Sequence, residues 1–222
     1  MKIIEPKIEI ENANYNQIMK NLERACRTCY RSEDKITEES YKTLLKNCIN
    51  RGHESILEHE KITIRMTCDI GVYKDLTRHR HASFSIESTR YCNYGKDKFD
   101  NQIKFIKPVN IEKGTEIYTE WEKSLEEIEK HYKKMVELGA TPDQMRMILP
   151  HSTAALVTMT ANIREWKHIF SLRCTKHAHP AVEQVMIPLL LHFKKHMPEI
   201  FENIEYDTEF DQAKYATLKI MD

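Results

Sequence analysis

Residues 78–91 read Arg-His-Arg-His-Ala-Ser-Phe-Ser-Ile-Glu-Ser-Thr-Arg-Tyr, which combines three Arg, two His, three Ser and one Thr with a single carboxylate. Arginine presents a planar fork of N–H donors that suits phosphate and carboxylate oxygens, and short hydroxyls are secondary donors. A solvated basic loop is the simplest interpretation of an Arg-rich run. Apolar and β-branched segments flank this run on both sides, so it lies within the fold. We therefore favour a built-in anion site.

The composition limits the class of protein. The chain has 222 residues, with 34 basic and 34 acidic side chains and a formal net charge of zero. Zero net charge argues against a general nucleic-acid or membrane-surface binder, which usually carries a basic excess. No apolar run approaches the ~20 residues that span a bilayer, and the first residues lack the layout of a signal peptide. Six cysteines in a chain of this size favour reduced thiols, so we expect a cytoplasmic protein without nucleic-acid or membrane partners.

Hydrophobic periodicity predicts a mixture of strands and helices. Strands are expected at 2–10, as an edge strand broken by Pro6, at 61–68, at 154–161, and around Ile103 and Phe105. Helices are expected at about 16–29, 41–49 with Gly52 as its C′ residue, 70–80, 115–138, 142–149, 162–174 and 180–197. With no internal repeats, we expect a single α/β (α+β) domain that spans residues 1–222. Several amphipathic helices need partners, which suits an oligomer.

Capping signals mark where the predicted helices begin. Asp69 is placed to cap the helix at 70–80, so the basic stretch begins at the C-terminal end of a helix and continues as a loop. A helix C-terminus carries negative dipole charge, so the side chains themselves must hold an anion. Residues 141–144 and 162–165 both have the pattern of a capping box. The helix that starts at 162 presents outward N–H groups that can hold a phosphate.

Cys26 and Cys29 form a C-x-x-C pair within the helix expected at 16–29. Such a pair can bind zinc or carry redox chemistry, but no second pair or nearby His pair completes a tetrahedral site, and the thioredoxin-like context is absent. His177 and His179 likewise lack a carboxylate partner at metal-ligand spacing. We expect the two thiols to be neighbouring core positions on one helix face, and we expect no metal site.

A longer pattern runs through the basic stretch. Arg78-His79-Arg80, followed after seven residues by Ser88 and then by Arg90-Tyr91, resembles the signature of the flavin-dependent thymidylate synthases. This resemblance implies FAD-dependent reductive methylation of dUMP to dTMP, with 5,10-methylenetetrahydrofolate as carbon donor and NADPH as reductant. The hydride would come from reduced flavin, without a cysteine nucleophile. The family also implies a central mixed or antiparallel sheet flanked by long helices, and a homotetramer with active sites at subunit interfaces.

The resemblance implies roles for individual residues. FAD would contact Ser55, Glu58, Arg78, His79, Arg80, Asn162, Arg164 and His168. The nucleotide dUMP would contact Asp75, Arg78, Glu87, Ser88, Arg90, Arg146 and Arg173, with Arg146 reaching the phosphate of a neighbouring subunit. The catalytic set would be Arg173, which helps to ionise N3 of the pyrimidine, Ser88, which orients dUMP, and His53, which handles protons.

Three positions depart from the family pattern. Ser85-Ile86 stands where the family often has Asn-Glu, and Glu87, one place later, is the nearest candidate for the missing acceptor. Asp75 stands where relatives tend to carry Gln or Glu. Its side chain is shorter, so we expect it to reach less far toward the pyrimidine. His81 replaces a residue that is usually apolar or small. None of these changes touches the Arg set, so we expect activity.

Two other functions stay open. A nucleic-acid-binding module could use the Arg-His cluster on phosphates, but zero net charge and the lack of regularly interleaved aromatic and basic residues count against it. Another flavoenzyme that acts on a nucleotide would share the same anion-binding residues. Substrate tests would separate that enzyme from a thymidylate synthase.

Overall fold

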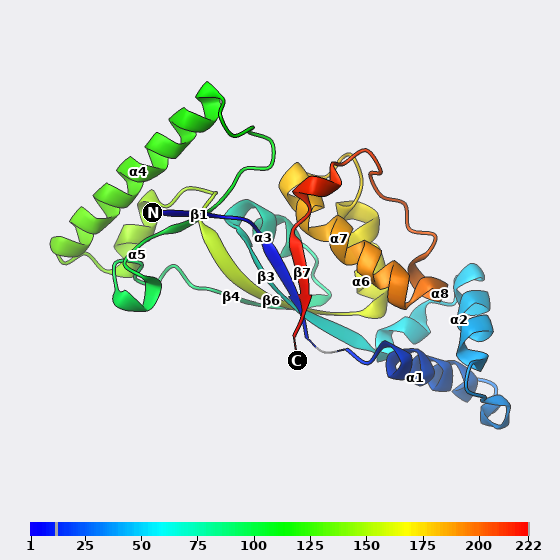
Figure 1. Cartoon of the computed structure of the whole chain (residues 1–222). Helices are drawn as coiled ribbons and strands as arrows, with labels where there is room; N and C mark the ends of the chain where they lie inside the picture. The colour runs from blue at the N-terminus through cyan, green and yellow to red at the C-terminus, as the bar shows by residue number, and fades with distance from the viewer. Residues whose placement is uncertain (12, 222) are drawn as a thin grey trace.

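The computed structural model describes residues 1–11 and 13–221, and it confirms the expected mixed α/β class (Figure 1). The strands are β1 (Lys2–Ile4), β2 (Lys7–Ile10), β3 (Lys61–Asp69), β4 (Ala82–Ile86), β5 (Lys104–Ile106), β6 (Ala154–Asn162) and β7 (Thr217–Ile220). The α-helices are α1 (Tyr15–Thr28), α2 (Ser40–Asn50), α3 (Ile70–Leu76), α4 (Glu116–Glu137), α5 (Pro142–Met145), α6 (Ile163–Arg173), α7 (Pro180–His196) and α8 (Pro198–Phe201). Short 3₁₀ helices are η1 (Glu33–Lys35), η2 (Ser55–His59), η3 (Asp97–Phe99), η4 (Arg146–Ile148) and η5 (Gln212–Lys214). Within the described ranges, none of these helices is long and apolar enough to cross a membrane.

A five-stranded sheet with the order β4-β6-β3-β2-β7 forms the centre of the molecule. β6 runs antiparallel to both β4 and β3, β2 is antiparallel to β3, and β7 is parallel to β2. The pairing of β3 with β6 extends over nine residues, from Lys61↔Asn162 to Asp69↔Ala154. A separate parallel pair joins β1 to β5. The mixed sheet expected from the family resemblance is therefore confirmed.

Three features of the expected strand pattern are wrong. Residues 2–10 form two strands in different sheets, and β2 lies inside the larger sheet because β7, which was not predicted, occupies the edge. The side chains of β7 are largely exposed, so no alternating apolar face marks it in the sequence. Residues 82–86 were expected in a loop but form β4, and the helix before them ends at Leu76 instead of near residue 80. Their alternation of half-buried and exposed side chains fits a strand at the sheet edge.

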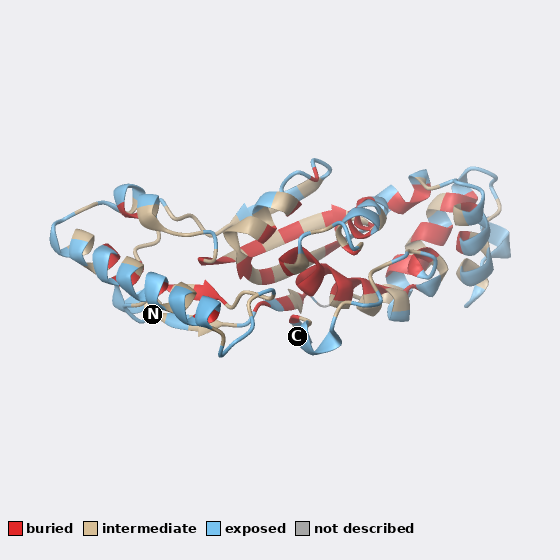
Figure 2. Cartoon of the chain, turned by 90° about the horizontal axis from the view of Figure 1, so that it is seen from above, coloured by how far each residue is buried: buried red, intermediate tan, exposed pale blue. Residues whose placement is uncertain are grey.

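The main apolar core lies on one face of this sheet. Ile62, Ile64 and Met66 of β3 are buried, whereas their neighbours along the strand are half-buried or exposed, as the two-residue period requires. Helices α6 and α7 pack with this face. With the short helix α8 they contribute a cluster of aromatic rings whose neighbouring centroids are 5.2–5.8 Å apart: Trp166, Phe170, Phe193 and Phe201. The buried band runs along the sheet and the inner sides of these helices (Figure 2).

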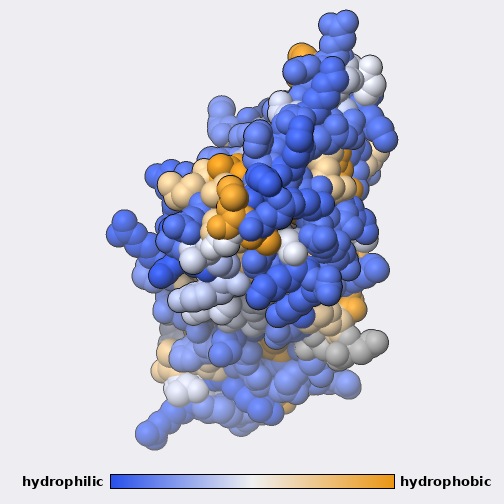
Figure 3. Space-filling view, turned by 90° about the vertical axis from the view of Figure 1, so that its left-hand side faces the viewer, coloured by the Kyte–Doolittle hydropathy of each residue, from blue (hydrophilic) through white to orange (hydrophobic). Residues whose placement is uncertain are grey.

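A second apolar cluster holds together the end of the molecule formed by β1, β5, α4 and α5. It consists of Tyr94, Ile103, Phe105, Leu125, Tyr132 and Met145. Thr115 caps α4, and Gly139 lies just beyond its C-terminal end with a positive φ of 80°. Seen from this end, the surface is mostly hydrophilic but carries an apolar patch (Figure 3). Two large apolar side chains of this region are about three-quarters exposed: Leu138, which directly follows α4, and Met147 of η4.

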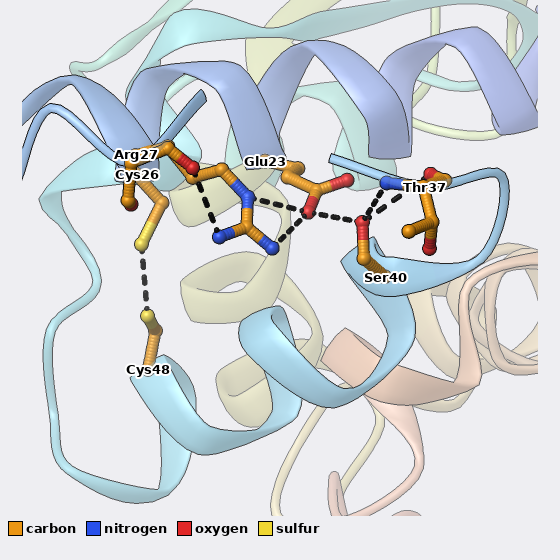
Figure 4. A network of polar contacts seen from close by, with 7 residues as sticks. Glu23, Cys26, Arg27, Thr37, Ser40 and Cys48 are labelled. Carbon is orange, nitrogen blue, oxygen red and sulfur yellow. Dashed lines mark hydrogen bonds and ion pairs between the residues drawn. The ribbon is translucent and has the colours of Figure 1, made fainter. Parts of the chain in front are cut away.

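Helices α1 and α2 pack through a buried polar group and a pair of thiols (Figure 4). The fully buried Glu23 carboxylate accepts hydrogen bonds from Arg27 and from Ser40 of α2, at 2.8 and 2.6 Å. Cys26 Sγ lies 3.1 Å from Cys48 Sγ. The expectation that Cys26 and Cys29 are neighbouring core positions is wrong, because Cys29 lies at the helix end and is exposed.

The C-terminus of α2 turns sharply at Gly52, which has a φ of 74°. The His53 N–H donates to the Cys48 carbonyl and the Gly52 N–H to that of Ile49, both at 2.9 Å, which is the Schellman arrangement. The sequence prediction of a C′ glycine is therefore confirmed. This turn leads the chain directly into η2.

We expect Gly52→Ala to lower the free energy of unfolding by about 1 kcal/mol, because a Cβ is unfavourable in the left-handed region. No heavy atom lies within 4 Å of where that Cβ would be, so the loss of stability would come from backbone strain and not from a steric clash. Gly52→Asn is the matched control and should lose less, since Asn tolerates this conformation. Urea denaturation measures both. Equal stability of the Ala variant and the wild type would show that the turn relaxes.

Candidate functional site

A cavity of about 700 Å³ lies between η2 and the first turns of α6. Ligand pockets typically have volumes of about 300–1,000 Å³. Its lining is polar and mixes acids with cationic and neutral donors: Glu54, Glu58, His81, Asn162, Arg164, Glu165, Lys167, His168, Ser171 and Ile204. Four of the residues that the resemblance assigns to FAD, namely Glu58, Asn162, Arg164 and His168, therefore meet in one cavity.

The local sequence explains why α6 begins at this cavity. Asn162 ends β6, and its side chain accepts a hydrogen bond from the Glu165 N–H at 2.8 Å. The second half of the predicted capping box is not formed, because the Glu165 carboxylate lies against His79 instead. Trp166 anchors the helix from inside, since its indole N–H donates to the Ile62 carbonyl of β3 at 3.1 Å.

Two ion pairs join the walls of the cavity. Arg164 contacts Glu58 of η2 at 2.6 Å, and Lys167 contacts Glu54, the residue before η2. The first pair is about half exposed, so it contributes little to stability. The pair between Lys167 and Glu54 is more buried. Both cations are thus neutralised by carboxylates of the same chain.

Beside the cavity, His79 lies between a carboxylate and a guanidinium. Its Nδ1 is 3.3 Å from Glu165 Oε1, and its Nε2 accepts a hydrogen bond from Arg173 Nε at 3.0 Å. Arg173 donates a second hydrogen bond from Nη2 to the Asp75 carbonyl at 2.9 Å. Burial, reinforced by the charge of Arg173, lowers the pKa of His79 to about 4. The His79 ring is therefore neutral near pH 7, and its contact with the Glu165 carboxylate is not an ion pair.

His79, Glu165 and His168 also place potential metal-ligand atoms within 4.8 Å of one another. Two histidines and a carboxylate are a common set of ligands for transition metals. The Arg173 guanidinium, which is bonded to His79, puts a positive charge next to any such metal ion. That charge disfavours a cation here, so we do not assign a metal ion to these three groups.

A second group of predicted residues lies on other elements. Arg90 Nε and Arg146 Nε contact the same carboxylate oxygen of Asp143, at 3.5 and 3.3 Å. Ser88 is close by in sequence, and its hydroxyl accepts a hydrogen bond from the Arg90 N–H at 3.3 Å. Arg146 begins η4 directly after α5, which lies beside α4, whereas α6 lies beside α7 (Figure 1). None of these residues lines the cavity next to α6.

The remaining predicted residues have varied positions. Arg78 and Arg80 are exposed on the turn between α3 and β4. Ser55 and His53 are exposed near the start of η2. Asp75 lines a separate cavity of about 360 Å³. The structure therefore brings the expected cofactor residues on η2 and α6 together, but it does not join all the predicted residues into one pocket.

Glu87 has a structural role within the chain. Its two carboxylate oxygens accept hydrogen bonds from the Tyr94 hydroxyl at 2.9 Å and from the Leu156 N–H at 3.2 Å. The negative charge of Glu87 contributes, after burial, to a raised pKa of Tyr94. These bonds join the end of β4 to β6 and to the second apolar cluster.

Glu165 was not predicted to be a site residue, and the sequence pattern indicated for it only a role in a capping box. Glu54, Lys167 and Ser171 of the cavity lining were not predicted either. An acid in the first turn of a helix is common, so nothing in the sequence distinguishes Glu165. The ion pair between Glu58 and Arg164 joins residues 106 positions apart, which no local pattern can reveal.

Comparisons with known proteins agree on one family. A family model described as thymidylate synthase complementing protein matches residues 13–199. A flavin-dependent thymidylate synthase from Pyrococcus abyssi is 34% identical over 160 residues, which cover 72% of this chain and 65% of that relative. One from Corynebacterium efficiens is 26% identical over 211 residues, covering 88% and 83%. The match thus spans slightly less than two thirds of the Pyrococcus protein.

A solved structure has a similar fold. The UMP/dUMP methylase PolB from Streptomyces cacaoi, bound with 5-Br dUMP, superposes with a TM-score of 0.73. The alignment covers 91% of this chain and 96% of that chain at 22% sequence identity. This similarity shows that the arrangement of strands and helices is shared.

The low pKa of His79 predicts a pH dependence of stability. Its folded-state pKa of about 4 lies below the ordinary 6.5, so the unfolded chain takes up the proton first as the pH falls. We expect wild type to lose unfolding free energy relative to His79→Gln between pH 6.5 and 4, by about 1 kcal/mol per pH unit. Urea denaturation at pH 7 and pH 5 measures this difference. A difference that does not vary with pH would show that His79 has the same pKa in the folded and the unfolded chain.

Proposed function

Because the chain belongs to the flavin-dependent thymidylate synthase family, we propose that it methylates dUMP to dTMP with FAD as cofactor. 5,10-Methylenetetrahydrofolate would supply the carbon and NADPH the reducing equivalents. The observation that carries the proposal is the polar cavity on α6 with the His79–Arg173 pair beside it. Both coincide with residues that the signature assigns to flavin and pyrimidine.

The donor set of the cavity fits a flavin nucleotide. Asn162 and Arg164 lie at the N-terminus of α6, where outward N–H groups and the helix dipole favour the phosphates. Glu58 can accept hydrogen bonds from ribose hydroxyls, and His168 presents an exposed ring. When bound, FAD would supply the hydride that reduces the transferred carbon to a methyl group. Among the described residues, no thiol lines this cavity, which suits methylation without a cysteine nucleophile.

Arg173 is the residue that we propose activates the pyrimidine. A guanidinium beside the uracil ring favours loss of the N3 proton, because the positive charge stabilises the resulting anion. The neutral His79 ring holds Arg173 without competing for that charge. Ser88 would orient dUMP, and exposed His53 is proposed to exchange protons with solvent near the folate.

The phosphate of dUMP would be held by Arg90 and Arg146, whose guanidinium groups already converge on one carboxylate of Asp143. A phosphate could replace that carboxylate between them. Since this pair does not line the cavity on α6, we propose that a second copy of the chain completes each site within a homotetramer. The apolar patch at the α4 end is available for such a contact (Figure 3).

Two further points belong to the proposal. UMP should be tested beside dUMP, because the solved methylase is described as acting on both. A cytoplasmic location suits the six cysteines, which are all free, since thiols stay reduced there.

The test begins with the visible spectrum of protein that has been incubated with FAD and desalted, before and after addition of dUMP. We expect retained flavin absorbance that shifts with dUMP, and dTMP formation when methylenetetrahydrofolate and NADPH are added. Arg173→Ala should reduce turnover by about 10²–10³-fold while flavin is retained. Arg24→Ala, an exposed arginine on α1, is the control and should be fully active. Absence of retained flavin and of any response to dUMP would refute the proposal.

A further inference from the structure

Glu165 is buried beside His79, outside the set of residues that the signature names. We propose that Glu165 is a positioning residue that fixes the tautomer of His79 and, through it, the orientation of Arg173. The catalytic consequence rests on the proposed function, whereas the tautomer does not depend on any substrate.

The first step is the proton on Nδ1. Glu165 Oε1 lies 3.3 Å from His79 Nδ1, and a carboxylate can only accept hydrogen bonds, so its negative charge favours the tautomer with the proton on that nitrogen. A neutral imidazole carries one N–H, and its other nitrogen then holds a lone pair. Glu165 thus selects which of the two ring nitrogens is the acceptor.

The second step is the bond to Arg173. The Arg173 Nε–H needs an acceptor, and His79 Nε2 lies 3.0 Å away. A guanidinium has no acceptor, so the opposite tautomer would place N–H against N–H and push Arg173 aside. With Nε bound to His79 and Nη2 to the Asp75 carbonyl, the plane of the guanidinium is fixed at two points. Its other N–H groups stay available for a substrate.

The test compares Glu165→Ala with Glu165→Gln. We expect ¹⁵N NMR of ring-labelled histidine, assigned with His79→Gln, to show the Nδ1–H tautomer in wild type and in the Gln variant, whose amide oxygen can accept the same proton. Glu165→Ala should raise the population of the Nε2–H tautomer of His79, since only Arg173 then opposes it. It should also lower kcat for dTMP formation by at least tenfold with flavin retention unchanged, and the Gln variant should recover most of that loss.

The outcomes separate this inference from the proposed function. An Nε2–H tautomer in wild type, or an unchanged tautomer in Glu165→Ala, would overturn the role of Glu165. If the tautomers behave as expected but wild type makes no dTMP, the positioning of Arg173 stands and the synthase proposal fails. A change of tautomer with unchanged kcat would refute the link to catalysis.

A second, independent observation concerns the thiols between α1 and α2. Cys26 and Cys48 are both buried and their sulfur atoms are 3.1 Å apart (Figure 4). A disulfide has a length of about 2.05 Å, so closure requires a shift of about an ångström. We infer that these two residues are an oxidation site, where a low-molecular-weight disulfide converts the thiols into a covalent link between the helices.

The reaction balances in two exchange steps. One protein thiol loses its proton to solvent, and its thiolate attacks the small disulfide and releases one small thiolate. The second protein thiol, deprotonated in turn, attacks the mixed disulfide and releases the other. The protein loses two electrons and two protons, and the small disulfide becomes two thiols. Burial and the contact with Cys48 raise the pKa of Cys26 to about 12, so the reaction is slow until the helices open locally.

The link would act on the wall of the cavity. The carbonyl of Cys48 accepts the His53 N–H in the turn that leads into η2. Tying Cys48 to α1 therefore restrains the chain that carries Glu54 and Glu58. Free thiols would leave this segment held only by noncovalent contacts.

Peptide mapping under non-reducing conditions, after incubation with oxidised glutathione, tests this inference. We expect a linked Cys26–Cys48 peptide in wild type and in Cys29→Ala, and at least tenfold less intramolecular disulfide in Cys26→Ala and Cys48→Ala. Oxidised wild type should also melt at a higher temperature than reduced wild type. Glutathione attached to the exposed Cys29 with no linked Cys26–Cys48 peptide, or a Cys26–Cys29 link instead, would overturn the inference.

Discussion

The nine-residue antiparallel pairing of β3 with β6 is the constraint on which the rest of the structure depends. Its first pair, Lys61↔Asn162, places η2, which precedes β3, beside α6, which follows β6, and so forms the cavity. On its other edge β6 pairs with β4 in the register Ala82↔Ala161. Residues just before position 82 therefore meet residues just after 161, which brings His79 to Glu165. Backbone register, and not sequence proximity, assembles the network.

Much of the fold could be predicted from the sequence where one face of an element is buried and the other is not. The strands β3 and β6 and the helices α1 and α4 have this periodicity, whereas α7 is marked by an almost continuous apolar run that is buried on most sides. Asp69, Thr141 and Gly52 mark element ends by their own chemistry. β7 could not be predicted, because its exposed side chains show no such pattern and its place depends on pairing with β2. The sequence Ala-Ser-Phe-Ser-Ile of β4 does alternate, but the basic residues before it favoured a loop.

From the sequence, residues of the candidate site could be predicted only by matching them to the family signature. That match named Glu58, Asn162, Arg164 and His168, which the fold brings into one cavity. It could not name their partners, because contacts such as those of Glu54 with Lys167 and Glu165 with His79 join distant parts of the chain. The same limit applies to the thiols. The C-x-x-C spacing pairs Cys26 with Cys29, whereas the sulfur atom that contacts Cys26 is that of Cys48 on the next helix.

The ion pairs around the site have a consequence for how the protein selects among anions. Arg164, Lys167, Arg90 and Arg146 each contact a carboxylate of the same chain, so the site carries its own counter-ions. Binding is then an exchange in which an incoming group must displace a carboxylate. A phosphate monoester, or a pyrophosphate that places two charges close together, can do this with its several acceptor oxygens, whereas chloride or the isolated single charges of a nucleic-acid backbone gain little by it. Because each of these cations is already paired with a carboxylate, anions with low or widely spread charge bind poorly at the site. The site is thus electrically balanced, as is the whole chain with its net charge of zero.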